Sequence, residues 1–137
     1  KEIELDPNLI EMSFGIYEKR NMNEENPKFL TECFDRPEGY NPPVDGECYD
    51  EVVARAGKVI EKMRERIYNN EFAEDDIVML VSHGALSHGI FEYLKKTPRS
   101  QYWDVDFNNC AIAELFLSRD GKEDDYTFLS TGFEKNW

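Results

Sequence analysis

A histidine follows directly after the longest apolar run of the sequence. Residues 77–81 are Ile-Val-Met-Leu-Val, and Ser82, His83 and Gly84 come next. An uninterrupted run of branched and apolar residues is typical of a strand that is buried on both faces of a parallel sheet. We therefore expect residues 77–82 to form an inner strand, with His83 at its C-terminal edge, where open α/β sheets bind their ligands.

The chemistry that this position favours is the binding of an anion such as phosphate. A helix is expected to begin just after Gly84, and a helix N-terminus offers free backbone N–H groups and a partial positive charge. Glycine lets the backbone approach a ligand closely, and a histidine beside it can share the charge of a bound phosphate. The alternative is a strand-end histidine with one structural hydrogen bond, and this short pattern alone leaves both interpretations open.

The surrounding elements are those of a single α/β domain that spans residues 1–137. Apolar residues recur at helical spacing over residues 50–68, and a second helix is expected over residues 86–95. A short helix is expected near residues 28–33, within a polar segment that is rich in proline. Residues 111–117 and 126–131 have the composition of strands, and Asp120-Gly121 between them favours an antiparallel pair. Helices between strands argue for helical layers packed on a sheet.

The charge of the chain excludes two classes of partner. It has 137 residues and a net charge of −13, from 29 acidic and 16 basic residues. Such a surface repels nucleic acid and anionic membranes, and no apolar run approaches the about 18 residues of a membrane helix. The three cysteines are far apart and in no metal-ligand spacing, which predicts a reducing, cytoplasmic location and no bound metal. His88 is expected to be a packing or surface residue.

Four stretches, in order along the chain, resemble motifs of the histidine phosphatases, the superfamily that includes cofactor-dependent phosphoglycerate mutase. Residues 9–18 are similar to the family segment Leu-x-Glu-x-x-Phe/Tyr-Gly-x-Trp-Glu-Gly. Residues 43–48, with Arg55 in the helix that follows, are similar to the Gly-Glu-Ser motif. Residues 81–84 resemble the second histidine motif, and residues 107–111 resemble the entry into the next strand. The resemblance covers nearly the whole chain.

The resemblance implies a role for each matching residue. His83 would contact the transferred phosphoryl group, and Gly84 would offer its backbone N–H to the same oxygens. Glu11 would donate a proton to the leaving group, while Ser82 and Phe14 would help to bind the substrate. The implied substrate is a small phosphorylated molecule, handled without a cofactor or a metal. The implied fold is a three-layer α/β sandwich, with helices flanking a mostly parallel sheet.

The sequence departs from the family pattern in one respect that matters for catalysis. The family's nucleophilic histidine stands in an Arg-His-Gly motif at the end of the first strand, and no Arg-His pair occurs here. The second phosphate-gripping arginine of the family is absent as well, since Arg55 falls in the helix after the Gly-Glu-Ser-like motif. We therefore expect the nucleophile, the central strand and most of the pocket's positive charge to lie outside these residues, and the chain alone to be inactive.

Three other functions are weighed against a phosphatase. A non-catalytic relative that serves as a binding module would account for the missing nucleophile. A phosphoglycerate mutase-type phosphotransferase is disfavoured, because the segment between Gly15 and Gly46 is short and lacks the paired arginines of the mutases, and Phe14 replaces their usual tyrosine. A Ser-His-Asp hydrolase is disfavoured because no Gly-x-Ser-x-Gly elbow is present. The oligomeric state is left open, a homo-oligomer included.

Overall fold

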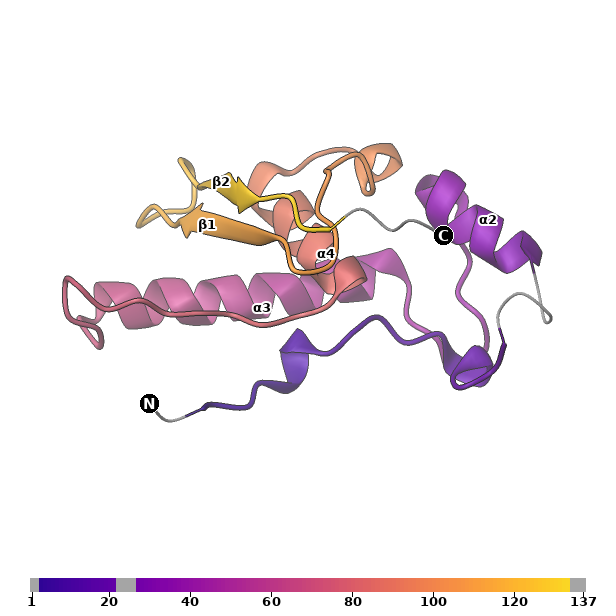
Figure 1. Cartoon of the computed structure of the whole chain (residues 1–137), viewed down its shortest axis with the longest axis horizontal. Coiled ribbons are helices and arrows are strands. Elements are labelled where there is room, and N and C mark those ends of the chain that lie inside the picture. Colours follow the sequence, from indigo (N-terminus) through magenta and orange to yellow (C-terminus); the bar gives the residue numbers. More distant parts are fainter. Residues whose placement is uncertain (1–2, 22–26, 134–137) are drawn as a thin grey trace.

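The computed structural model describes residues 3–21 and 27–133. Within them the long helix α3 (Tyr49–Tyr68) runs beneath the helix α4 (Gly84–Lys95) and the hairpin of β1 (Ile112–Phe116) and β2 (Asp125–Ser130), as Figure 1 shows. Helix α2 (Pro27–Asp35) lies at the end of the molecule where α3 begins. Short 3-10 turns occur at Pro7–Leu9, Gly15–Tyr17, Pro37–Gly39 and Arg99–Gln101.

Helices α3 and α4 confirm the two helices that the apolar spacing predicts, and they pack against each other. The buried positions of α3 include Val52, Ala56 and Ile60, which are four residues apart and therefore share one face. At the start of α3 the Glu51 carboxylate accepts a hydrogen bond from the Cys48 backbone N–H at 2.8 Å. This bond is the backbone half of a capping box, and it fixes where the helix begins.

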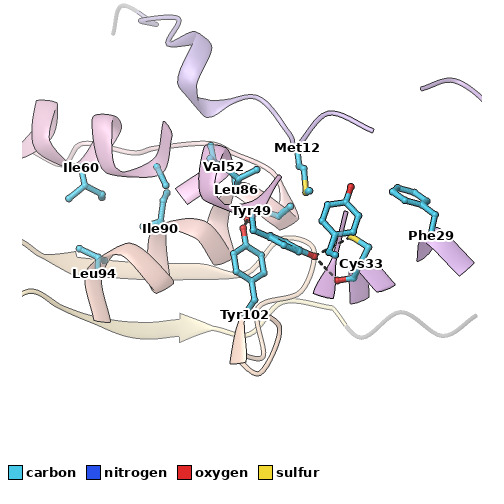
Figure 2. Packing of buried hydrophobic residues seen from close by; sticks show 13 residues of the cluster. Met12, Phe29, Cys33, Tyr49, Val52, Ile60, Leu86, Ile90, Leu94 and Tyr102 are labelled. Atoms are coloured by element: carbon cyan, nitrogen blue, oxygen red, sulfur yellow. Dashed lines mark hydrogen bonds between the residues drawn. The ribbon is translucent and has the colours of Figure 1, made fainter. Parts of the chain in front are cut away.

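An aromatic core joins α2, α3 and the loop that follows α4. The Tyr49 and Tyr102 rings lie 4.3 Å apart, and the Tyr49 hydroxyl donates to the Cys33 carbonyl oxygen (Figure 2). The Trp103 indole N–H also donates to that carbonyl, at 3.0 Å. The Tyr102 hydroxyl donates to the Ala85 carbonyl oxygen at 2.6 Å, so the core directly holds the first turn of α4.

The antiparallel hairpin that the sequence predicts is also confirmed. Strands β1 and β2 pair from Ile112 opposite Ser130 to Phe116 opposite Asp125, with a bulge after Ile112. Phe91 of α4 packs against the β2 rings of Tyr126 and Phe128, at 4.6 and 5.6 Å between centroids. The hairpin therefore packs against α4 through Phe91.

The predicted inner strand over residues 77–82 is not confirmed among the described residues. They run extended toward α4, but no strand among residues 3–21 and 27–133 pairs with them. The side chains of Ile77, Met79 and Val81 are 81%, 76% and 75% exposed. The described sheet has only the two antiparallel strands, and the mostly parallel three-layer sandwich is not found. An apolar run forms a strand only when a neighbouring strand supplies its backbone partners.

Candidate active site

The carboxylate of Glu11 lies at the N-terminus of α4. It accepts hydrogen bonds from the backbone N–H groups of Ala85 and Leu86, at 3.2 and 3.3 Å, and from the N–H of Met12 at 2.8 Å. The first N–H groups of a helix have no partner within the helix and attract anions. The position that the sequence assigns to phosphate binding is thus within reach of the residue that it assigns to proton transfer.

His83 and Gly84 stand at the same helix N-terminus. His83 is the N-cap residue of α4, with an extended backbone and an exposed side chain that makes no capping hydrogen bond. Gly84 is the first helical residue, and a β-carbon placed there would lie 3.6 Å from a carboxylate oxygen of Glu11. The structure therefore brings Glu11, His83 and Gly84 together across more than 70 residues of sequence.

Ser82 and Phe14 make contacts within the protein. The Ser82 hydroxyl donates to the Leu9 carbonyl oxygen at 3.0 Å, which joins the segment before α4 to the segment that carries Glu11. The Phe14 ring is half-buried and meets Phe29 edge-on, at 5.6 Å between centroids. Their contribution to substrate binding stays a prediction.

The motif segments around Phe14 and Gly46 cross each other closely. Phe14 and Gly46 form an antiparallel bridge, the Ile16 N–H donates to the Val44 carbonyl oxygen at 3.0 Å, and the Glu47 N–H donates to the Ser13 carbonyl oxygen at 2.9 Å. Gly15 sits in this crossing with a φ of +53°, which is the left-handed region. The two motifs are therefore parts of one folded unit.

Replacing Gly15 by Ala should destabilise the protein strongly. A β-carbon at this position would lie 2.1 Å from the Val44 carbonyl oxygen and 2.4 Å from the Gly46 nitrogen, so the backbones must separate. Strain at a left-handed site alone costs about 1–3 kcal/mol. Urea unfolding of Gly15→Ala should show at least that loss. Gly39→Ala is the matched control, because a β-carbon at Gly39 meets nothing within 4 Å; equal stability of the two variants would contradict the crossing.

A largely buried ion pair between Arg55 and Glu47 stabilises the crossing of the Phe14 and Gly46 segments. The Glu47 carboxylate accepts two hydrogen bonds from the Arg55 guanidinium, at 2.7 and 2.8 Å, and a third from the Ser13 N–H at 2.9 Å. Burial alone would raise the pKa of Glu47, but the hydrogen bonds from Arg55 and from the Ser13 N–H bring that pKa below its usual value. Glu47 is therefore an ionised anchor and not a proton donor.

The family model described as histidine phosphatase superfamily (branch 1) matches residues 1–125. The chain belongs to this superfamily. Its members include phosphatases and mutases, so membership supports an activity of that general class. No curated protein and no solved structure matches the chain.

The motifs that resemble those of the superfamily lie close together in the fold. Glu11 accepts a hydrogen bond from the first turn of α4, directly after His83. Glu47 of the Gly-Glu-Ser-like motif accepts one from Ser13, two residues after Glu11. The sequence placed Arg55 in a helix but indicated none of its contacts. Its partners lie up to 47 residues away in the chain, so only the fold could reveal them.

The remaining histidine of this chain is a core residue. His88 is buried on α4, 4.7 Å from the Trp103 ring, and burial lowers the pKa of its imidazole. The lowered pKa favours a neutral imidazole at pH 7, as expected of a packing residue. Across residues 3–21 and 27–133, no three His, Cys, Asp or Glu side chains gather as a metal site requires, and no helix is long and apolar enough to cross a membrane.

Proposed function

We propose that the chain is part of a phosphomonoester hydrolase that works through a phosphohistidine intermediate, with the nucleophilic histidine supplied from outside these 137 residues. The observation that carries this proposal is the contact of the Glu11 carboxylate with the first N–H groups of α4, directly after His83 and Gly84. An acid and an anion-binding site in contact are what cleavage of a phosphate ester needs.

In the proposed reaction the substrate phosphate takes the place of the Glu11 carboxylate at the helix N-terminus. The N–H groups of α4 and the imidazole of His83 then bind the oxygens on which negative charge gathers during transfer. The outside histidine attacks phosphorus, and the P–O bond to the leaving group breaks. Glu11, displaced but still adjacent, enters this step protonated, with a proton taken from solvent or from the substrate monoanion, and it gives that proton to the departing oxygen.

The second half of the reaction restores the enzyme. Water attacks phosphorus and the P–N bond to the histidine breaks, which releases inorganic phosphate. The carboxylate of Glu11 takes the proton that the attacking water loses, and Glu11 is again in the protonated form in which it entered the first step. A small phosphorylated molecule suits this scheme, because only its phosphate and leaving oxygen need to be gripped.

The proposal includes the parallel sheet that the sequence predicts. Residues 77–82 present exposed apolar side chains, and no strand in the described part of the chain pairs with their backbone, as at a sheet edge without its neighbour. A strand that brings the nucleophilic histidine alongside would cover this edge and complete a three-layer sandwich.

The test compares the 137-residue chain with a version extended upstream in its gene. We expect the chain alone to hydrolyse no p-nitrophenyl phosphate, and the extended protein to hydrolyse it in the presence of a chelator and to retain label from ³²P-substrate on histidine. Steady hydrolysis by the purified 137-residue chain would refute the outside nucleophile. An inactive extended protein would favour the non-catalytic binding module.

A further inference from the structure

A single arginine, Arg55, binds both the segment that carries Glu11 and the Glu47 carboxylate. The Arg55 Nε and one Nη2 proton bind the Glu47 carboxylate, as described above. Its Nη1 donates to the carbonyl oxygens of Asn8 and Ile10, at 2.8 and 3.1 Å, and Nη2 also donates to the Glu11 carbonyl oxygen at 3.4 Å. A guanidinium has five N–H donors, and here each has an acceptor within the protein.

Side chains bind every backbone carbonyl of residues 8–11. The four consecutive carbonyl oxygens of this segment all accept hydrogen bonds from side chains, three from Arg55 and one from Ser82. On the far side of Glu11, the Ser13 N–H donates to Glu47, which Arg55 also holds. Both ends of the Glu11 backbone are thus fixed by one guanidinium and its carboxylate partner.

The environment strengthens these contacts. The side chains of Arg55 and Glu47 are only 14% and 21% exposed, so water competes weakly for their hydrogen bonds. The arrangement also needs the planar fork of arginine, because a lysine ammonium is a compact charge that cannot span two carboxylate oxygens and three carbonyls.

We propose that Arg55 is a positioning residue: by holding the backbone on both sides of Glu11, it directs the Glu11 carboxylate to the first turn of α4. The inference rests on the proposed function where it concerns catalysis. Arg55 does not bind phosphate, because its five donors are already occupied within the protein. Its effect is exerted through Glu11, and an error of about 1 Å in the place of such a group costs on the order of 10²-fold in rate.

The catalytic test uses the extended protein with an alkyl phosphate and p-nitrophenyl phosphate as substrates. Arg55→Met should lower kcat for the alkyl phosphate by about 10- to 100-fold, with little change in KM, and should affect the nitrophenyl ester far less, because that leaving group needs no proton. Arg55→Lys should behave like Arg55→Met. In a Glu11→Gln background, Arg55→Met should cause little further loss.

Arg66→Met is the matched control. Arg66 lies on the same helix and also forms an ion pair with an N-terminal residue, Glu4, at 2.9 Å, but it does not touch the segment around Glu11. Its replacement should leave both rates unchanged. Losses of Arg55→Met that are equal on both substrates, or that multiply with those of Glu11→Gln, would overturn the proposal, as would full activity of Arg55→Lys.

A second measurement does not depend on activity. The Ala85 and Leu86 amides lie in the first turn of α4, so their hydrogen bonds go to Glu11 and not to the helix. In Arg55→Met their hydrogen exchange, followed by NMR in the extended protein, should be faster by at least about tenfold, while amides inside α3 keep their rates. If the extended protein has no phosphatase activity, the proposed function fails and this exchange alone decides on Arg55. Unchanged exchange at Ala85 and Leu86 overturns the inference.

Discussion

Replacing Glu11 by glutamine in the extended protein should slow hydrolysis of an alkyl phosphate by about 10²–10⁴-fold, which is the usual contribution of a general acid. The same change should slow hydrolysis of p-nitrophenyl phosphate by less than about tenfold, because a nitrophenolate leaves without a proton. Ala85 and Leu86 donate to different oxygens of Glu11, and glutamine keeps one oxygen that can still accept one of these hydrogen bonds, so the fold should be retained. The ratio of the two rate losses is therefore the decisive quantity.

A control variant and the ratio of the two rate losses test the role of Glu11. Glu38→Gln removes one negative charge from an exposed position and should change neither rate. Equal losses on both substrates in Glu11→Gln would mean that Glu11 only shapes the pocket. The proton donor would then have to be another group than Glu47, whose carboxylate is held ionised by Arg55 and Ser13.

Local patterns predicted the helices and the hairpin because their information is local. The spacing of Val52, Ala56 and Ile60 defines a buried face of α3 before any partner is known, and Asp120-Gly121 marks the turn between two strands. Residues 77–82 show the limit of such patterns. Their composition is that of a buried strand, but pairing depends on a neighbour, and none lies beside them among the described residues.

The candidate site was predictable in its members but not in its contacts. Family motifs selected Glu11, His83 and Gly84, and the fold places all three at the N-terminus of α4. That the Glu11 carboxylate itself binds this helix N-terminus followed from no pattern, since it depends on a segment 74 residues away. The contacts of Arg55 could not be predicted either. Arg55 binds backbone carbonyls, which every residue has, so no residue type indicates them.

Replacing Arg64 by methionine should lower the free energy of unfolding by about 3–5 kcal/mol, the usual cost of leaving one member of a buried ion pair alone. Arg64 of α3 binds both carboxylate oxygens of Asp124, at 2.9 and 2.6 Å, and also donates to the Ser118 carbonyl oxygen. The two side chains are 9% and 4% exposed. Methionine would leave the Asp124 carboxylate buried, with hydrogen bonds from Ser118 but no counter-charge.

The pH dependence of this loss distinguishes a charge effect from a packing effect. The hydrogen bonds from Arg64 lower the pKa of Asp124 in the folded protein. A lowered folded pKa contributes stability that is fully present above the unfolded pKa of about 3.9 and is lost as pH falls through the folded value. The stability difference between the parent protein and Arg64→Met should therefore be largest near pH 7 and should shrink below about pH 4.

Urea unfolding of both proteins at several pH values between 7 and 3 measures this difference. Lys122→Met is the matched control, because Lys122 forms an exposed ion pair with Asp120 in the same hairpin, at 2.9 Å. Exposed pairs contribute about 0–1 kcal/mol, so this variant should differ little from the parent protein at any pH. A loss in Arg64→Met that stays constant down to pH 3 would show that the arginine stabilises the hairpin through the packing of its stem, and not through its charge.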